Sequence, residues 1–147
     1  MYQQLKEKLW AYIVHNNPDL MFDLQEEYNV TKYLDEKVSA VMPTVLRLLG
    51  ESKEGHAIQE LAMNELTAGL KPSRYHYIQH IISEEFEADY ERLRESGLLT
   101  YETVNLVSIC KDTLDKLGFS EEKISSTEIH EVIKQEISSY LNGAKTK

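Results

Sequence analysis

Two histidines and a glutamate within residues 74–96 have a spacing that could bind a divalent metal ion. His76, His80 and Glu84 recur every four residues, so they lie along one face of a helix with about 5–6 Å between successive Cβ atoms. Two imidazoles at this spacing can chelate one ion, and the carboxylate can add a third ligand. No second helix supplies an obvious further ligand. The alternative is a solvated polar face, because the three residues lie opposite the apolar residues of the same segment: Ile78, Ile81, Ile82 and Phe86.

Three glutamates interrupt the apolar stripes of the helices to which they belong. In helical projection Glu65, Glu85 and Glu136 each lie between apolar residues of their own segment. A carboxylate taken out of water is costly unless it is paired or hydrogen-bonded. One hypothesis is therefore a polar cluster inside a helical bundle that binds a cation or a small polar ligand. The alternative places the glutamates at stripe edges, held by tyrosine hydroxyls, lysines or arginines.

The remaining reactive residues form no catalytic pattern. Cys110 lies one helical turn from Leu106 and from Leu114, which indicates a small buried apolar residue rather than a nucleophile. The chain has no phosphate-binding loop, dinucleotide-binding turn, zinc-protease helix motif or nucleophile elbow. No histidine follows a glutamate by three residues, as carboxylate-bridged di-iron bundles require. We therefore expect neither enzymatic activity nor a cofactor.

Tyrosine is the commonest aromatic residue of the chain, with nine tyrosines against three phenylalanines. Tyrosine has an apolar ring and a polar end, so it suits wet core edges and protein interfaces. Tyr33, Tyr75 and Tyr90 are the candidates for exposed or interface positions, with a place at the core edge as the alternative.

The elements that must position these side chains are helices. Apolar residues recur at helical spacing along almost the whole chain, and no strand-like alternation persists, which predicts an all-α fold of about six helices. Helices adjacent in sequence are expected to pack antiparallel in a single domain, 1–147, because their connections are short, and residues 143–147 are expected to be a flexible tail. Residues 19–29 can form a further short helix. The expected ranges are 3–15, 32–49, 54–68, 74–96, 101–117 and a last helix from the Ser125–Glu128 capping box to Asn142–Gly143.

Individual residues predict where these helices begin, end or bend. Ser73 or Pro72 is expected to mark the N-terminus of the segment 74–96, and Gly97 and Gly118 to end their segments. Gly50 is expected to end the segment 32–49, and Pro43 to kink it. That segment is expected to turn six apolar residues inward: Leu34, Val38, Val41, Val45, Leu46 and Leu49.

The charge of the chain excludes some classes of partner. Sixteen basic and 25 acidic residues give a net charge of −9, which repels a phosphate backbone and an acidic membrane surface. The first ten residues lack the apolar region of a signal peptide, and no apolar run approaches the roughly 18 residues of a transmembrane helix. We therefore expect a cytoplasmic protein with no direct nucleic-acid or membrane partner.

Parts of the chain resemble a family of helical bacterial proteins. The likeness rests on residues 56–86, in particular Gly69-Leu70-Lys71-Pro72-Ser73-Arg74-Tyr75 and the stretch from Ile81 to Glu85-Phe86. Residues 12–23, with their Asn17-Pro18-Asp19 turn, are similar too, so the resemblance covers the first two thirds of the chain. The family is an uncharacterised domain often found among mobile-element genes. The resemblance implies an all-helical cytoplasmic domain with no known catalytic activity.

These observations favour a non-enzymatic helical module that acts through protein contacts, either with a partner or with a second copy as a dimer. One alternative is a metal or small-ligand binder that uses the bundle carboxylates or the histidine-rich helix face. Another is an accessory protein of a mobile genetic element, associated with DNA-processing machinery, which rests on the resemblance alone.

Overall fold

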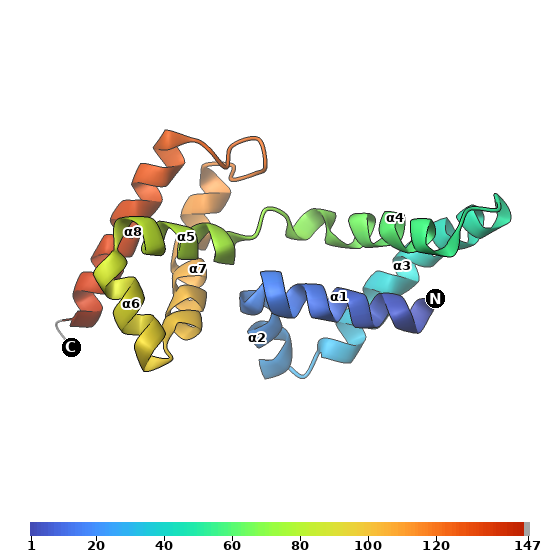
Figure 1. Cartoon of the computed structure of the whole chain (residues 1–147), viewed down its shortest axis with the longest axis horizontal. Helices are drawn as coiled ribbons and strands as arrows, with labels where there is room; N and C mark the ends of the chain where they lie inside the picture. Colours follow the sequence, from blue (N-terminus) through green and yellow to red (C-terminus); the bar gives the residue numbers. More distant parts are fainter. Residues whose placement is uncertain (146–147) are drawn as a thin grey trace. The chain divides into compact units, whose positions relative to one another are not determined.

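The prediction of an all-α fold is confirmed (Figure 1). The computed structural model describes residues 1–145, with side chains as far as Gly143, and within that range it contains eight α-helices, one short 3₁₀ helix and no strand. None of the helices in this range is both long enough and apolar enough to cross a membrane. The bounds are α1 Tyr2–Asn16, α2 Pro18–Glu26, α3 Val30–Gly50, α4 Gly55–Thr67, η1 Ala68–Leu70, α5 Arg74–Glu85, α6 Glu87–Ser96, α7 Leu99–Lys116 and α8 Thr127–Lys145.

The chain divides into two units, each with a hydrophobic core of its own. Unit 1 is Met1–Lys71, and unit 2 begins at Pro72. The boundary falls where a new helix starts, because Pro72 has no N–H to continue a helix and Ser73 caps α5. The Ser73 hydroxyl accepts a hydrogen bond from the backbone N–H of His76 at 3.1 Å, which confirms the predicted cap. One core was expected for the whole chain, and the structure has two.

Unit 1 is a bundle of α1, α3 and α4, each of which contacts the other two, and α2 packs against α1 and α3. Polar contacts also join α1 to α3: Lys6 Nζ lies 2.6 Å from Asp35 Oδ1, and the Tyr2 hydroxyl donates to the same oxygen at 3.1 Å. The apolar positions recur every three or four residues on each helix and meet in one core. The buried core residues are Leu5, Leu9, Ile13, Leu34, Val38, Val41, Val45, Leu48, Ile58 and Ala62.

The inward face of α3 differs from the expected one near its C-terminal end. Four of the six predicted residues are buried, but the next core position is Leu48. Leu46 and Leu49 are 63% and 48% exposed, so the prediction that they point inward is wrong. The buried positions follow alternating steps of four and three residues, and Leu48 continues that series after Val45. The last turns of α3 therefore expose leucine on a second face.

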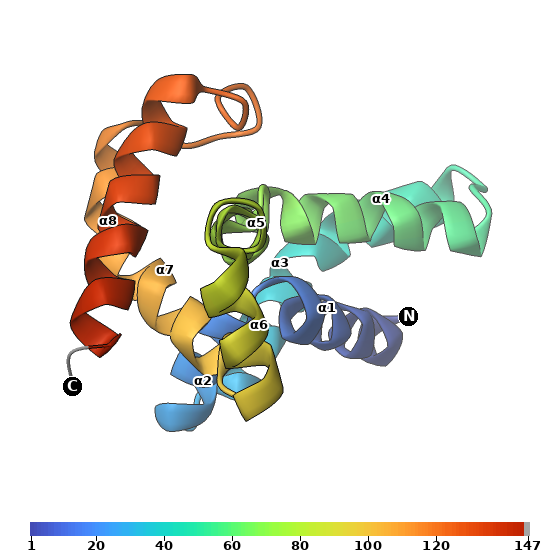
Figure 2. The same ribbon diagram turned by 60° about the vertical axis from the view of Figure 1, so that its left-hand side comes forward.

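Unit 2 consists of α5, α7 and α8, with α6 packed against α5 and α7 (Figure 2). Two contacts join α5 to α7 and to the segment after it. Arg74 Nη2 lies 2.5 Å from Asp115 Oδ1, and the rings of Tyr77 and Phe119 are 4.7 Å apart. The buried core residues are Tyr75, Ile78, Ile81, Ile82, Leu93, Leu106, Val107, Cys110, Leu114, Ile129, Ile133, Ile137 and Leu141.

The predicted single helix 74–96 is two helices, α5 and α6, which meet at Phe86. Phe86 has φ −135° and ψ 53°, so the chain leaves the helical region there for one residue. Its N–H still donates to the Ile82 carbonyl, and its carbonyl accepts from the Tyr90 N–H, both at 2.9 Å. The break therefore leaves neither of these groups without a hydrogen bond, and the Phe86 ring packs against the core of unit 2. With α2, this break raises the number of α-helices in the described range above the expected six.

Of the helix ends predicted at Gly50, Gly97 and Gly118, two are confirmed and one is wrong. Gly97 and Gly118 follow α6 and α7 with φ of 76° and 71°, a left-handed conformation that glycine adopts without strain. By contrast, α3 includes Gly50, and the left-handed residue that follows it is Ser52, with φ 60°. Pro43 lies inside α3, which continues through it.

Both ends of α8 differ from the prediction. Its first turn is capped by Ser126 rather than Ser125, since the Ser126 hydroxyl accepts from the Ile129 N–H at 3.3 Å. The helix continues to Lys145 instead of ending at Asn142–Gly143. Residues 143–145 of the predicted tail are therefore helical, and residues 146 and 147 lie outside the described residues.

Candidate functional sites

A pocket of about 250 Å³ opens between α3, α4 and η1 in unit 1. We call it the α3–α4 pocket. The wall on α3 consists of residues about one and two helical turns apart, namely Tyr33, Lys37, Ala40 and Val41. The opposite wall consists of Glu65, Leu66, Gly69 and Leu70. Tyr33 and Glu65, which the sequence assigned to different kinds of site, thus line the same pocket.

The charged groups of the α3–α4 pocket form no ion pair within the described part of the chain. Lys37 Nζ lies 5.6 Å from the centroid of the Tyr33 ring, which is a cation–π contact. Glu65 makes no hydrogen bond or ion pair with any described residue. Burial raises the pKa of Tyr33, so its hydroxyl remains a hydrogen-bond donor at neutral pH. The pocket therefore offers an ammonium, a carboxylate and a hydroxyl beside apolar side chains.

Glu85 is the last residue of α5 and is paired with α8. Its Oε2 lies 3.1 Å from Lys134 Nζ, and its Oε1 lies 3.4 Å from His130 Nε2. The hydrogen bond and the charge of Lys134, followed by His130, hold the pKa of this carboxyl below its ordinary value. With its side chain 34% exposed, Glu85 lies at the edge of the interface rather than in the core. This is the arrangement that the sequence suggested as the alternative to a buried cluster.

Glu136 lies between α8 and α7. Its Oε1 accepts a hydrogen bond from the Thr113 hydroxyl. Burial, and then the neighbouring carboxylate of Glu136, raise the pKa of the Cys110 thiol. Cys110 is fully buried and stays a thiol at neutral pH, so it has the environment of a structural cysteine. Glu136 also lines an open groove with Ile109, Gln135, Ser139 and Tyr140.

The three glutamates do not share one core. Glu65 belongs to unit 1, whereas Glu85 and Glu136 belong to unit 2 and have different partners. The hypothesis of a single interior carboxylate cluster therefore has no support in the fold. Of the three, Glu65 lines a half-open pocket together with a residue of opposite charge, Lys37.

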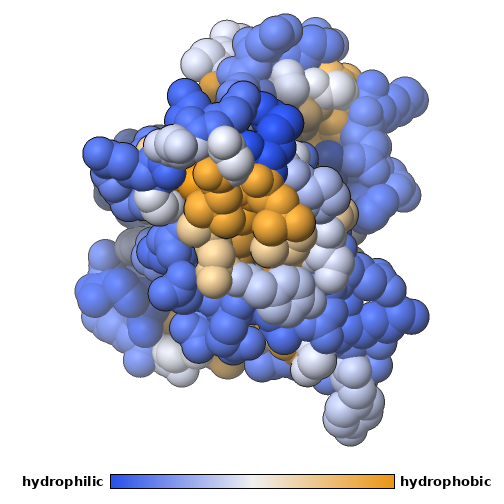
Figure 3. Space-filling model, turned by 90° about the vertical axis from the view of Figure 1, so that its right-hand side faces the viewer, coloured by the Kyte–Doolittle hydropathy of each residue, from blue (hydrophilic) through white to orange (hydrophobic). Residues whose placement is uncertain are grey.

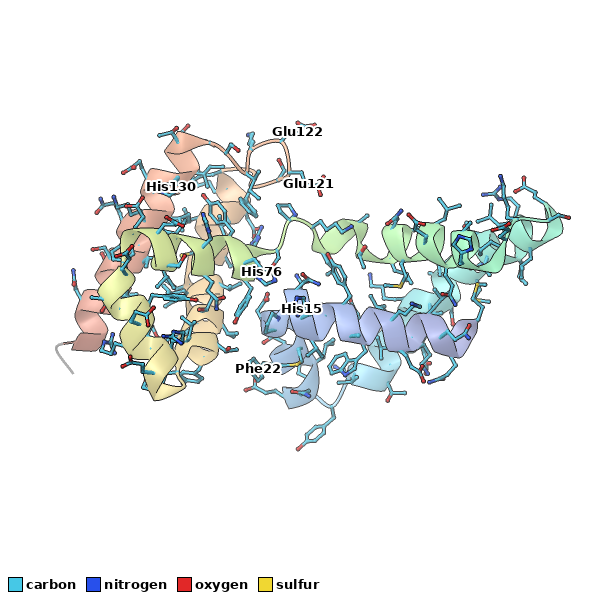
Figure 4. The ribbon with its side chains drawn as sticks, viewed as in Figure 1. His15, Phe22, His76, Glu121, Glu122 and His130 are labelled. Carbon is cyan, nitrogen blue, oxygen red and sulfur yellow. The ribbon has the colours of Figure 1, made fainter. Side chains whose placement is uncertain are left out.

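The predicted histidine face is on α5. His76, His80 and Glu84 are all exposed, and Figure 4 shows His76 near the start of that helix and His130 on α8. Nowhere among residues 1–145 do three or more His, Cys, Asp or Glu side chains gather in a group that could hold a metal ion. The metal hypothesis thus gains no geometric support from the described chain.

The three candidate interface tyrosines have different surroundings. Tyr75 is 6% exposed, so the prediction of an exposed position is wrong for this residue. Its hydroxyl donates to Thr100 at 3.2 Å and accepts from Gln79 at 3.0 Å, which anchors it within unit 2. Tyr90 and Tyr33 are partly buried against the cores of units 2 and 1.

An exposed apolar face on α3 was not predicted. It consists of the exposed Leu46 and Leu49 together with Met42, which is partly buried against the core of unit 1, and we call it the α3 leucine face. These residues follow each other by four and three positions, so they form one stripe beside the buried stripe of the same helix. Figure 3 views the molecule from the side on which α3 ends, and hydrophobic side chains gather there within a hydrophilic surround. The signal that could have revealed it is the number of leucines, since residues 46, 48 and 49 cannot all face one core.

Comparison of the chain with protein-family models, with curated proteins and with solved structures finds no match. The resemblance to a mobile-element domain family therefore stays a prediction. Function has to be inferred from the residues and contacts of this chain.

Proposed function

We propose that the protein is a non-enzymatic interaction module that binds a partner protein through the α3 leucine face. The supporting observation is the exposure of Leu46 and Leu49, at 63% and 48%, on one stripe with Met42. Apolar surface that is gathered in one place and surrounded by polar residues is typical of interaction sites. Covering these side chains would remove apolar area from water, which is the main driving force of association.

Charge favours a basic partner over a second copy of the chain. The net charge is −9, so two copies repel each other at long range. A basic protein is attracted and oriented by the same field, while the leucines supply the short-range contact. We therefore propose a partner with a net positive charge that presents apolar side chains to α3.

The test is co-purification from the native host with three forms of the protein. They are the wild type, the double variant Leu46→Gln/Leu49→Gln and the control Ile109→Gln. Ile109 is 50% exposed but lies on α7 in unit 2, so it matches the leucines in exposure and not in position. Proteins captured by the wild type are then purified and titrated against each form.

We expect one basic protein to bind the wild type and the Ile109 variant equally, and to bind the double variant at least about tenfold more weakly. The interaction should also weaken as salt is raised, because the charges are exposed. Equal binding to all three forms would exclude the α3 leucine face. A dimer of the wild type that the double variant abolishes would replace the basic partner with a second copy.

A further inference from the structure

We propose that the α3–α4 pocket binds a small zwitterion with an apolar side chain, of the class of the free hydrophobic α-amino acids. This inference concerns a different set of residues from the α3 leucine face and is independent of the proposed protein contact.

The size of the pocket limits the ligand to a small molecule. Its volume of about 250 Å³ is below the roughly 300–1,000 Å³ of pockets that enclose drug-sized ligands. Among its lining residues, Val41 is buried and Leu66 and Leu70 are partly buried. These side chains can cover an aliphatic group of a few carbon atoms.

The charges of the pocket match the two ends of an amino acid. Lys37 belongs to α3 and Glu65 to α4, on opposite walls, and neither has an ion-pair partner within residues 1–145. An α-carboxylate can therefore bind the Lys37 ammonium while the α-ammonium binds Glu65, both as charge-assisted hydrogen bonds. Tyr33, whose ring contacts Lys37, also lines the pocket, and its hydroxyl is a further donor for the carboxylate.

A zwitterion fits this pocket better than an ion of either sign. A simple anion would leave Glu65 unneutralised beside it and would be repelled by a chain of net charge −9. A simple cation would be repelled by the positive charge of Lys37. Only a ligand with both charges can form an ion pair with Lys37 and with Glu65 at once. Its aliphatic side chain then lies against Leu66 and Leu70.

The test is a titration of the isotope-labelled full-length protein with three related probes, followed by NMR. The probes are leucine, 3-methylbutan-1-amine and 4-methylpentanoate, which share a similar aliphatic group and differ in their charged ends. We expect leucine to bind at least about tenfold more tightly than either singly charged probe. Its shifts should be confined to residues near 33–41 and 65–70.

Two variants and two matched controls identify the groups involved. Glu65→Gln should weaken the binding of leucine and of 3-methylbutan-1-amine by about tenfold or more. Lys37→Gln should weaken the binding of leucine and of 4-methylpentanoate by about tenfold or more. Glu60 and Lys32 are exposed residues on the same two helices, outside the pocket. Glu60→Gln and Lys32→Gln should therefore leave the affinity for all three probes unchanged. All four positions are exposed, so the variants should fold.

Three results would overturn the proposal. One is the absence of shifts in the pocket with leucine up to its solubility limit. Another is equal binding of leucine and one singly charged probe, which would make the pocket a site for a single charge. The third is leucine binding that survives both pocket substitutions. A loss of protein partner binding in Leu46→Gln/Leu49→Gln with leucine binding intact would separate the two proposals.

Discussion

Glu85 Oε2 lies 3.1 Å from Lys134 Nζ, so one ion pair joins the last residue of α5 to α8. His130, one helical turn before Lys134, adds a second contact to the same carboxylate at 3.4 Å. Lys134 is the largest cause of the lowered pKa of Glu85. The pair therefore links the pH dependence of stability to a specific helix contact in unit 2.

Glu85→Gln should destabilise unit 2 at neutral pH and have a diminishing effect in acid. Because the folded-state pKa of Glu85 lies below its unfolded value, the stabilisation is present above the ordinary glutamate pKa and is lost as pH falls through the folded pKa. Urea unfolding of the wild type and the variant at a series of pH values measures the difference directly. The two curves should converge in acid.

Glu84→Gln is the matched control for this prediction. Glu84 is the neighbouring residue on α5, is exposed and has no hydrogen bond or ion pair among the described residues. Its substitution should leave the free energy of unfolding nearly unchanged at every pH. A difference between wild type and Glu85→Gln that does not vary with pH would contradict the ion-pair explanation.

Tyr28→Gly should stabilise unit 1 by about 1 kcal/mol. Tyr28 has φ 57° and follows α2 in the left-handed conformation, where a side chain causes strain. The Asn29 N–H donates to the Leu24 carbonyl at 2.9 Å, which is the bond of a Schellman helix end. The side chain is 94% exposed, so its removal loses little packing. Thermal unfolding would measure the gain.

Gly97→Ala tests the same effect of a side chain in the left-handed conformation, and here we expect a loss of stability instead of a gain. Gly97 has φ 76° at the end of α6, and an added Cβ would meet no atom within 4 Å. The expected loss of about 1 kcal/mol would therefore come from the backbone conformation alone. If Tyr28→Gly proved destabilising while Gly97→Ala behaved as expected, Tyr28 would have to make a contact that stabilises unit 1.

Leu48→Ala should lower the free energy of unfolding much more than Leu49→Ala, although the two residues are adjacent. Leu48 is buried in the core of unit 1, so its truncation should cost about 2–5 kcal/mol. Leu49 is 48% exposed, so its truncation should lower the free energy of unfolding by less than about 1 kcal/mol. Chemical denaturation of the two variants compares them directly. Equal losses would contradict the register of α3.

Cys110 should resist alkylation in the folded protein. Its side chain is fully buried, and burial together with Glu136 raises the pKa of its thiol, so little thiolate is present at neutral pH. Modification by iodoacetamide should be at least about 100-fold slower than in urea, because it requires unit 2 to open locally. Mass spectrometry over time measures both rates. Rapid labelling under native conditions would show that α7 is loosely packed.

The sequence predicted well those features that depend on near neighbours in the chain. The all-α fold follows from apolar spacing, and Ser73, Gly97 and Gly118 mark helix ends because caps act within one helical turn. The break at Phe86 was not predictable in the same way. Phenylalanine is compatible with a helix, so its residue type alone does not indicate a break, and the core of unit 2 against which it packs is formed by residues of several helices.

The candidate sites depended much more on tertiary structure. Leu46, Leu48 and Leu49 cannot all face one core, and only packing against α1 and α4 decided that Leu48 is buried while Leu46 and Leu49 are exposed. Tyr75 is of a residue type that is typical of interfaces, yet its hydroxyl is hydrogen-bonded to Thr100 and Gln79 inside unit 2.

The sequence by itself determined that the chain is helical, acidic and without a recognisable catalytic motif, because periodicity, charge and motif spacing are local properties. It also singled out Tyr33 and Glu65, but as members of different sites. Only the tertiary structure decided that these two residues share a pocket with Lys37, whereas Glu85 and Glu136 are engaged elsewhere. The reason is physical: a helix sets which residues share its own face, and the packing of separate helices sets which faces meet.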